Sequence, residues 1–286
     1  MKLTDIIKGA SPSLSFEVFP PKTSDKYESV SHAVRDIAAL DPSYMSVTYG
    51  AGGGTSDFTV KIASEVLSYG VTPLAHLTCV SSSKAKIFEQ LDKLKSAGIS
   101  NILALRGDIP DGLDKSSLEY HYAYELIDEI KRYGDFCIGG ACYPETHPES
   151  ESTVKDLEYL KIKVEHGCEF LTTQMFFDND ILYSFMYRLL SIGVDVPVVA
   201  GIMPVTSVSQ INRICKISGN SLPQKFLRIV DRFGNDPKSL KQAGIAYATE
   251  QIVDLYANGV NAVHVYSMNN PDVARKIQSN LSDIIK

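Results

Sequence analysis

Cysteine is scarce in this chain, and the few cysteines form no pattern. The 286 residues include five cysteines, an odd number with no Cys-x-x-Cys pair. A disulfide scaffold or a zinc site needs a different and more regular spacing. We therefore expect reduced, mostly buried thiols and no metal site; the thiols belong to Cys79, Cys137, Cys142, Cys168 and Cys215.

Long apolar segments are also missing. No stretch reaches the length of uncharged apolar sequence that a membrane helix needs. The first ten residues, MKLTDIIKGA, interrupt their apolar residues with Asp5 and Lys8, so they lack the core of a signal peptide. The expected location is the cytoplasm, without a membrane partner.

An excess of positive charge is absent as well. The chain has 28 Lys and Arg residues against 34 Asp and Glu residues, a formal net charge of -6. A general nucleic-acid or anionic-membrane surface would need clustered basic residues. Nucleic acid is therefore not an expected partner, although local basic residues leave small anionic ligands open.

What the chain does have is a repeat of strand-like and helix-like segments. Eight apolar, β-branched runs lie at 14–19, 44–50, 73–80, 101–108, 136–144, 170–177, 196–205 and 262–269. The stretches between them have apolar residues three and four apart, as in Tyr27, Val30, Val34 and Ile37, which is typical of helices. Eight such units without a linker predict one (β/α)₈ TIM barrel over residues 1–286. An extra helix is expected at 221–233, and a doubly wound sheet is the alternative.

The first run, SLSFEVFPPK, contains an unusual glutamate. Strand alternation puts Leu14, Phe16 and Val18 on one face and Glu17 on the other, and the two prolines end the strand just after it. On this stretch alone an exposed edge position is favoured, because charged residues are mostly exposed.

Polar residues recur at the ends of the predicted strands. In a barrel these ends converge on one mouth, where active sites form, so this recurrence favours a functional Glu17. The residues are Glu17, Thr48, Tyr49, His76, Arg106, Asp108, Tyr143, His147, Gln174, Tyr266 and Asn269.

Several of these residues also have structural interpretations. His76 suits a core histidine, Arg106 and Asp108 suit a local ion pair, and Lys163 in LEYLKIKVEHG suits a solvated helix position. GAGGGTS (50–56) lacks the order of a phosphate-binding loop and favours a tight turn.

Seven ordered motifs carry a family resemblance. FEVFPPK, SVTYGAGG, HLTC, ALRGD, YPETHPE, TTQMFFD and GIMPV, in this order and spacing, resemble the methylenetetrahydrofolate reductase family from about Ser15 to the C-terminal region. The resemblance implies a barrel that holds FAD at its mouth and reduces 5,10-methylenetetrahydrofolate to 5-methyltetrahydrofolate with NADH or NADPH. Hydride passes through the flavin in two half-reactions.

The resemblance also implies roles for individual residues. Glu17 would be the general acid that helps open the folate ring, and Asp108 would lie beside the flavin and favour the cationic intermediate. Residues implied to bind FAD are Thr48, Tyr49, Ala51, His76, Arg106, Gly107, Asp108, Tyr143, His147, Asp156 and Lys163. Residues implied on the folate and nicotinamide side are Gln174, Gln210 and Asn270.

Two positions depart from the family pattern. Ile214 stands where some relatives have a phenylalanine that covers the ligand, and Asn270 where an arginine can follow the last strand. The chain ends soon after the barrel, so no regulatory domain and no control by S-adenosylmethionine are expected.

Two other functions stay open on the residues alone. A flavin-free barrel lyase or aldolase could use Glu17 and Asp108 as acid and base, and a non-catalytic folate-binding subunit could keep the fold. A homo-oligomer is expected, while the choice between NADH and NADPH and the need for an electron-transfer partner protein stay open.

Overall fold

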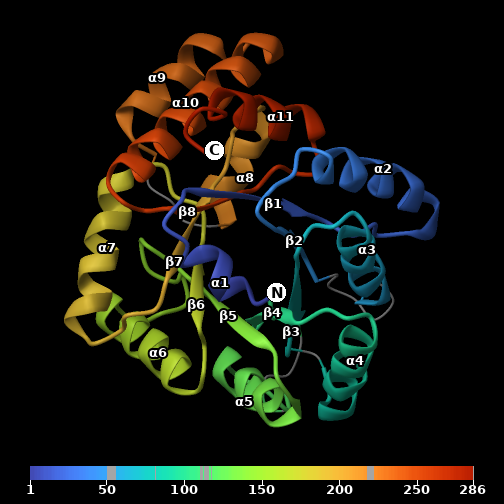
Figure 1. The fold of residues 1–286 in the computed structure, drawn as a ribbon. Coiled ribbons are helices and arrows are strands. Elements are labelled where there is room, and N and C mark those ends of the chain that lie inside the picture. The colour runs from blue at the N-terminus through green and yellow to red at the C-terminus, as the bar shows by residue number, and fades with distance from the viewer. Residues whose placement is uncertain are drawn as a thin grey trace.

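A closed barrel of parallel strands forms the centre of the molecule in the computed structural model (Figure 1). The structure describes residues 1–49, 56–80, 82–109, 112, 116, 118–217 and 222–285. Within these residues the strands are β1 (Ser13–Val18), β2 (Met45–Val47), β3 (Pro73–Thr78), β4 (Asn101–Leu105), β5 (Cys137–Cys142), β6 (Phe170–Thr173), β7 (Val198–Ile202) and β8 (Ala262–Val265). Each strand pairs with the next, and β1 pairs with β8, which confirms the predicted barrel and excludes the doubly wound sheet.

Helices surround the barrel, as Figure 1 shows. The exception is α1 (Leu3–Ile7), which lies over one end of the barrel. The other helices are α2 (Tyr27–Ala38), α3 (Ser56–Ser68), α4 (Lys84–Ser96), α5 (Ala123–Tyr133), α6 (Thr153–Glu165), α7 (Asn179–Ser191), α8 (Val208–Ile217), α9 (Gln224–Phe233), α10 (Pro237–Ala257) and α11 (Pro271–Asn280), with a 3₁₀ turn, η1, at Ser24–Lys26. The extra helix predicted at 221–233 is confirmed as α9.

The apolar faces of the strands look outward, toward the helices. Phe16 and Val18 of β1 are fully buried in one cluster with Val34 and Ile37 of α2. This packing uses the apolar side of each strand, so the alternate residues, including Glu17, point into the barrel.

The short helix α1 closes the bottom of the barrel. Its Leu3 and Ile7 pack in one cluster with Leu74, Leu103 and Phe170 of the strands. The backbone N–H of Leu3 donates to Asn101 Oδ1 at 2.8 Å. The end opposite this apolar plug is therefore the one open to ligands.

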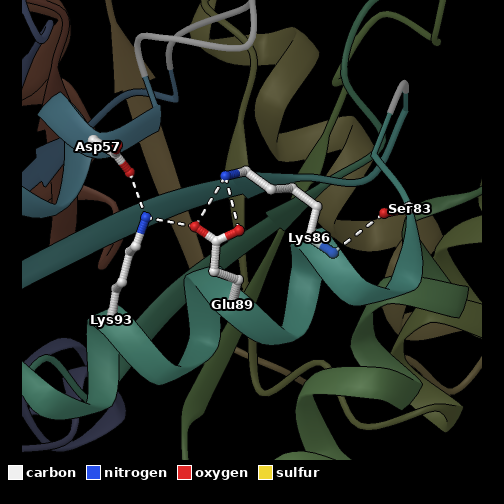
Figure 2. A network of polar contacts seen from close by, with 5 residues as sticks. All are labelled: Asp57, Ser83, Lys86, Glu89 and Lys93. Atoms are coloured by element: carbon white, nitrogen blue, oxygen red, sulfur yellow. Dashed lines mark hydrogen bonds and ion pairs between the residues drawn. The ribbon is translucent and has the colours of Figure 1, made fainter.

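A polar network fixes neighbouring helices on the outside of the barrel (Figure 2). Lys93 of α4 contacts Asp57 of α3 at 2.7 Å and Glu89 at 2.6 Å, and Lys86 also contacts Glu89. Ser83 caps α4 by accepting a hydrogen bond from the Lys86 backbone. Such exposed ion pairs contribute at most about 1 kcal/mol each to the stability of the fold. The helices are therefore held on the barrel mainly by their buried apolar faces.

Several strands end earlier than the sequence pattern predicts. The run at 170–177 was expected to be strand throughout, but β6 stops at Thr173. Phe176 and Phe177 follow in the loop and are still buried, and their carbonyls accept hydrogen bonds from Gln251 and Tyr247 of α10. The loop after β6 thus contains buried apolar residues, and in the sequence these residues look like a continuation of the strand.

Candidate active site at the barrel mouth

Glu17 lies inside the barrel, near the end of β1. It is 7% exposed, and burial raises the pKa of its carboxyl to about 8. The Ser267 hydroxyl donates to the Glu17 carbonyl at 2.9 Å, which ties β1 to the loop after β8. The interpretation of Glu17 as an exposed edge residue is therefore wrong, and at neutral pH the side chain is mostly a neutral acid.

His76 of β3 faces Glu17 across the barrel. His76 Nε2 lies 4.0 Å from Glu17 Oε2, and both side chains are 9% exposed. Burial lowers the pKa of His76 to about 3, so its imidazole is neutral. Its Nε2 is buried and has no hydrogen-bond partner among the described residues.

A second interior histidine, His264 of β8, has a hydrogen-bond partner for each of its two ring nitrogens. Its Nδ1 lies 2.7 Å from the Ser15 hydroxyl and its Nε2 lies 2.8 Å from the Ser46 hydroxyl. Burial, with His76 nearby, lowers its pKa to about 3. His264 and Ser46 were not among the predicted site residues, although alternation in AVHV, with Val263 facing outward, pointed to an inward His264.

A cleft of about 470 Å³ lies beside this interior, between the loops after β4 and β5 and helices α5 and α6. Its volume is typical of small-molecule sites. Seven of the residues predicted to bind the cofactor line it: Arg106, Gly107, Asp108, Tyr143, His147, Asp156 and Lys163. Glu17 is not part of its wall. Burial and, next, the charge of Glu17 raise the pKa of Tyr266 well above its usual value, and the Tyr266 hydroxyl donates to the Thr173 carbonyl at 2.5 Å.

Arg106 forms its ion pair with a residue that the sequence did not indicate. Its Nη1 and Nη2 contact the Glu149 carboxylate at 2.6 and 2.9 Å, and its Nε donates to the Gly107 carbonyl. The expected local pair with Asp108 is therefore not the main contact, and Asp108 is exposed. Glu149 lies in YPETHPE, beyond the end of the predicted strand, and for that reason it was not predicted as a site residue.

Lys163 reaches into the cleft from α6. Its ammonium donates to the Ala141 carbonyl at 2.7 Å, and burial lowers its pKa. The interpretation as a solvated helix lysine is therefore wrong. Asp156, two turns earlier on the same face of α6, is buried and accepts a hydrogen bond from the His147 backbone at 3.1 Å, while burial raises its pKa.

Gly107 shapes the cleft floor through its backbone. Its φ is +87°, and a Cβ at this position would lie 2.8 Å from Val80 Cγ1. Only glycine fits here without moving a buried neighbour, so the positive φ and the packing against Val80 require glycine at this position.

The remaining predicted residues lie outside the cleft wall. Gln210 Oε1 accepts hydrogen bonds from the backbone of Thr206 and Ser207, and Asn270 Oδ1 accepts from Val273, so both cap helices. Gln174 is half-buried after β6, and Thr48 and Tyr49 are half-buried after β2. Ile214 packs with Phe177 and Phe226 in an apolar cluster. Ala51 and most of GAGGGTS lie outside the described residues.

Two further findings concern membrane-spanning helices and metal sites. Across the described parts of the chain, no helix is long and apolar enough to cross a membrane. In the same parts, no group of three or more His, Cys, Asp or Glu side chains is arranged to hold a metal ion.

Comparison with known proteins shows relatives over nearly the whole chain. The chain is 35% identical over 266 residues to the 5,10-methylenetetrahydrofolate reductase of Pectobacterium carotovorum, covering 93% of this chain and 88% of that one. The Escherichia coli protein of the same name is 33% identical over 266 residues, covering 93% and 89%. "Methylenetetrahydrofolate reductase (NADH) 1" of Arabidopsis thaliana is 35% identical over 300 residues, but this chain spans only 51% of its length.

A solved structure agrees on the fold. An uncharacterised Clostridium thermocellum protein, described as binding two copies of 5-methyl-5,6,7,8-tetrahydrofolic acid, superposes with a TM-score of 0.64 at 15% identity, covering 99% of each chain. At this identity the likeness shows the barrel alone. The family model described as "Methylenetetrahydrofolate reductase" matches residues 2–282, and the chain therefore belongs to the methylenetetrahydrofolate reductase family.

Proposed function

We propose that this chain is a flavin-dependent reductase that converts 5,10-methylenetetrahydrofolate to 5-methyltetrahydrofolate with electrons from NADH or NADPH. The observation that carries the proposal is a Glu17 carboxyl buried inside the barrel, with its pKa raised by burial to about 8, beside a cleft lined by Arg106 and Lys163. Family membership supplies the reaction class.

The residues of the cleft fit a flavin dinucleotide. Among the described residues, Arg106 uses three of its five N–H donors and Lys163 uses one of the three N–H donors of an ammonium, so both retain donors for phosphate oxygens. Tyr122 and Tyr159 present stacked rings on the rim, with their centroids 5.5 Å apart. When bound, FAD would accept hydride from the nicotinamide and deliver it to the folate.

Glu17 would supply the proton that the folate chemistry needs. Opening the folate ring releases an amine, and a neutral carboxyl can protonate that nitrogen as its bond to the one-carbon unit breaks. The barrel interior excludes water around Glu17 and keeps it protonated near neutral pH. The exposed Asp108 carboxylate at the cleft would stabilise the cationic one-carbon intermediate through its charge.

Three further properties belong to this proposal. A homo-oligomer stays a prediction, while the choice between NADH and NADPH and the need for an electron-transfer partner protein stay open. Gln174, Gln210 and Asn270 stay the predicted folate-side and nicotinamide-side residues, and the capping bonds of the last two would have to be compatible with that role.

An anaerobic stopped-flow experiment tests the function. The purified protein should show bound-flavin absorbance that bleaches with NADH or NADPH and returns on addition of methylenetetrahydrofolate. A protein without flavin bands would support a lyase or aldolase, and one that binds folate but never oxidises nicotinamide would support a binding subunit.

Glu17→Gln separates the two half-reactions. We expect it to keep FAD and its reduction by nicotinamide but nearly to abolish reoxidation by folate. Glu165→Gln, at the exposed end of α6, is the matched control and should behave like the wild type. Equal loss of both half-reactions in Glu17→Gln would contradict the proton-donor role.

A further inference from the structure

We propose that Asn269, in the loop after β8, is a positioning residue for the general acid: its side-chain amide binds the backbone of Phe19 and thereby holds Glu17 at its depth in the barrel. Ser267 of the same loop holds the backbone of Glu17 itself. This inference rests on the proposed function, because it explains how a proton donor is kept in a fixed place.

The Asn269 amide contacts both backbone groups of one residue. Its Oδ1 accepts a hydrogen bond from the Phe19 N–H at 2.7 Å, and its Nδ2 donates to the Phe19 carbonyl at 2.9 Å. The Ser267 hydroxyl donates to the Glu17 carbonyl at 2.9 Å, and Ser267 is buried, so this bond is shielded from water. Three hydrogen bonds therefore join the loop after β8 to the end of β1.

The chain beyond β1 has little else to fix its backbone. β1 ends at Val18, whose carbonyl accepts a hydrogen bond from the Thr48 N–H at 3.0 Å. The two residues after Phe19 are Pro20 and Pro21, which have no N–H to donate. Past Val18, the two hydrogen bonds of the Asn269 amide therefore replace those of a strand ladder.

The other strands of the barrel continue differently. After β3, the Cys79 N–H donates to the backbone carbonyl of Leu105, and after β6 the Gln174 N–H donates to that of Cys142. In the part of the chain that the structure describes, only the residue after β1 has both its N–H and its carbonyl bonded by one side chain. This arrangement is at the strand that carries the general acid.

The backbone of the loop after β8 is itself unusual. Met268 and Asn269 have φ angles of +55° and +53°, in the left-handed region. Residues with a Cβ rarely adopt this region, and asparagine does so more readily than methionine. Asn270 anchors the loop on its other side, since its Oδ1 accepts a hydrogen bond from the Val273 N–H of α11. A strained turn that is fixed at both ends is typical of functional sites.

The position of Phe19 determines the position of Glu17. The two residues are two apart in an extended segment, or about 7 Å, so a movement of Phe19 is passed on to Glu17. A general acid must lie within hydrogen-bond distance of the atom that it protonates, and a misplacement of about 1 Å can cost about 100-fold in rate. Loss of the Asn269 amide should therefore slow the folate half-reaction, in which Glu17 acts.

Titration of the Glu17 carboxyl reports whether it stays buried. Burial is what raises the pKa of Glu17 to about 8. The groups that face it are His76 of β3, Tyr44 before β2 and Tyr266 after β8; burial lowers the pKa of His76 to about 3 and raises the pKa of both tyrosines. All three are neutral around pH 8, so a change in the titration midpoint of Glu17 reports a change in its burial.

Asn269→Gly is the main variant, because glycine keeps the left-handed backbone and removes only the amide. The infrared carbonyl band of protonated Glu17, identified by its absence in Glu17→Gln, is followed against pH in the purified protein. The midpoint should fall by about one pH unit or more as water reaches the carboxyl. Asn235→Ala, at an exposed position between α9 and α10, is the matched control and should leave the midpoint within about half a unit of the wild type.

Ser267 provides a second pair of variants, which decides the matter if Asn269→Gly does not fold. Ser267→Ala loses the hydrogen bond to the Glu17 carbonyl and should lower the midpoint in the same direction. Ser267→Thr keeps a hydroxyl and should restore the midpoint to within about half a unit of the wild type. A residue that only supported the fold would lower the free energy of unfolding and leave the midpoint of Glu17 unchanged.

Amide hydrogen exchange of Phe19 tests the contact directly. The Phe19 N–H should exchange about tenfold faster or more in Asn269→Gly, because its acceptor is gone. An unchanged midpoint of Glu17 in folded Asn269→Gly, or an unchanged exchange rate of Phe19, would overturn the inference.

A kinetic measurement connects these readouts to the reaction. The folate half-reaction of Asn269→Gly should slow by about 10- to 100-fold, while flavin reduction by nicotinamide stays within about twofold of the wild type. A wild-type folate rate in a variant with a lowered midpoint would overturn the positioning role. Failure of the wild-type protein to reduce folate would refute the proposed function, whereas titration and exchange would still decide whether Asn269 holds Glu17 in place.

Discussion

Glu17→Gln should stabilise the fold while it removes folate reduction. In the native protein, burial raises the pKa of Glu17 from 4.5 to about 8, so the folded state holds a proton that the unfolded chain releases. The contribution of Glu17 to the free energy of unfolding is therefore fully present below about pH 4.5, and it is lost as the pH rises through the pKa of the folded state. Glutamine has nearly the same shape and cannot ionise, so the variant escapes this loss.

The size of the effect follows from the pKa difference. Each unit between the two pKa values corresponds to about 1.36 kcal/mol. Between about pH 4.5 and pH 7, ionisation of Glu17 in the unfolded chain costs the wild type about 3 kcal/mol, and at pH 8 about 4 kcal/mol. A domain of ordinary stability has about 5–15 kcal/mol in total, so the difference is large enough to measure.

Urea unfolding of wild type and Glu17→Gln at about pH 5, 7 and 8 measures this difference. The free-energy gap between the two proteins should grow in favour of the variant by about 3 kcal/mol from the lowest to the highest pH. Glu165→Gln, at an exposed position, should show a pH-independent change within about 0.5 kcal/mol. A gap for Glu17→Gln that stays constant or shrinks with rising pH would refute the view of Glu17 as a buried acid.

Three more outcomes can be measured on the same protein. Gly139→Ala should destabilise it by about 2 kcal/mol or more in urea unfolding, because the new Cβ would lie 2.3 Å from the Phe170 ring; unchanged stability would contradict the tight packing of the barrel interior. Arg106→Lys should weaken FAD binding about tenfold in calorimetric titration, because a lysine loses the forked donor geometry, and an unchanged affinity would remove Arg106 from the phosphate site. Asp108→Asn should slow the folate half-reaction and change the flavin reduction potential in dye equilibration; an unaltered potential would remove the electrostatic role of its exposed carboxylate.

Much of the site was predictable because barrels bring strand ends together. Arg106, Tyr143 and His147 stand at or just after the ends of two consecutive predicted strands, and all three line one cleft. The pairing of Arg106 with Glu149 was not predictable, because Glu149 lies in a loop whose path no periodic pattern describes. The same holds for the capping bonds of Gln210 and Asn270.

The sequence alone predicted eight strand and helix units in one domain and favoured a barrel, whereas the pairing of β1 with β8 in the structure excluded the doubly wound sheet. It also determined that Glu17 stands on the face opposite Phe16, since that follows from the period of two. What only the tertiary structure decided is which face looks inward, how deeply Glu17 is buried, and that His76 lies within 4.0 Å of it. Burial and pKa depend on neighbours from distant strands, and closing β1 onto β8 is what brings those neighbours together.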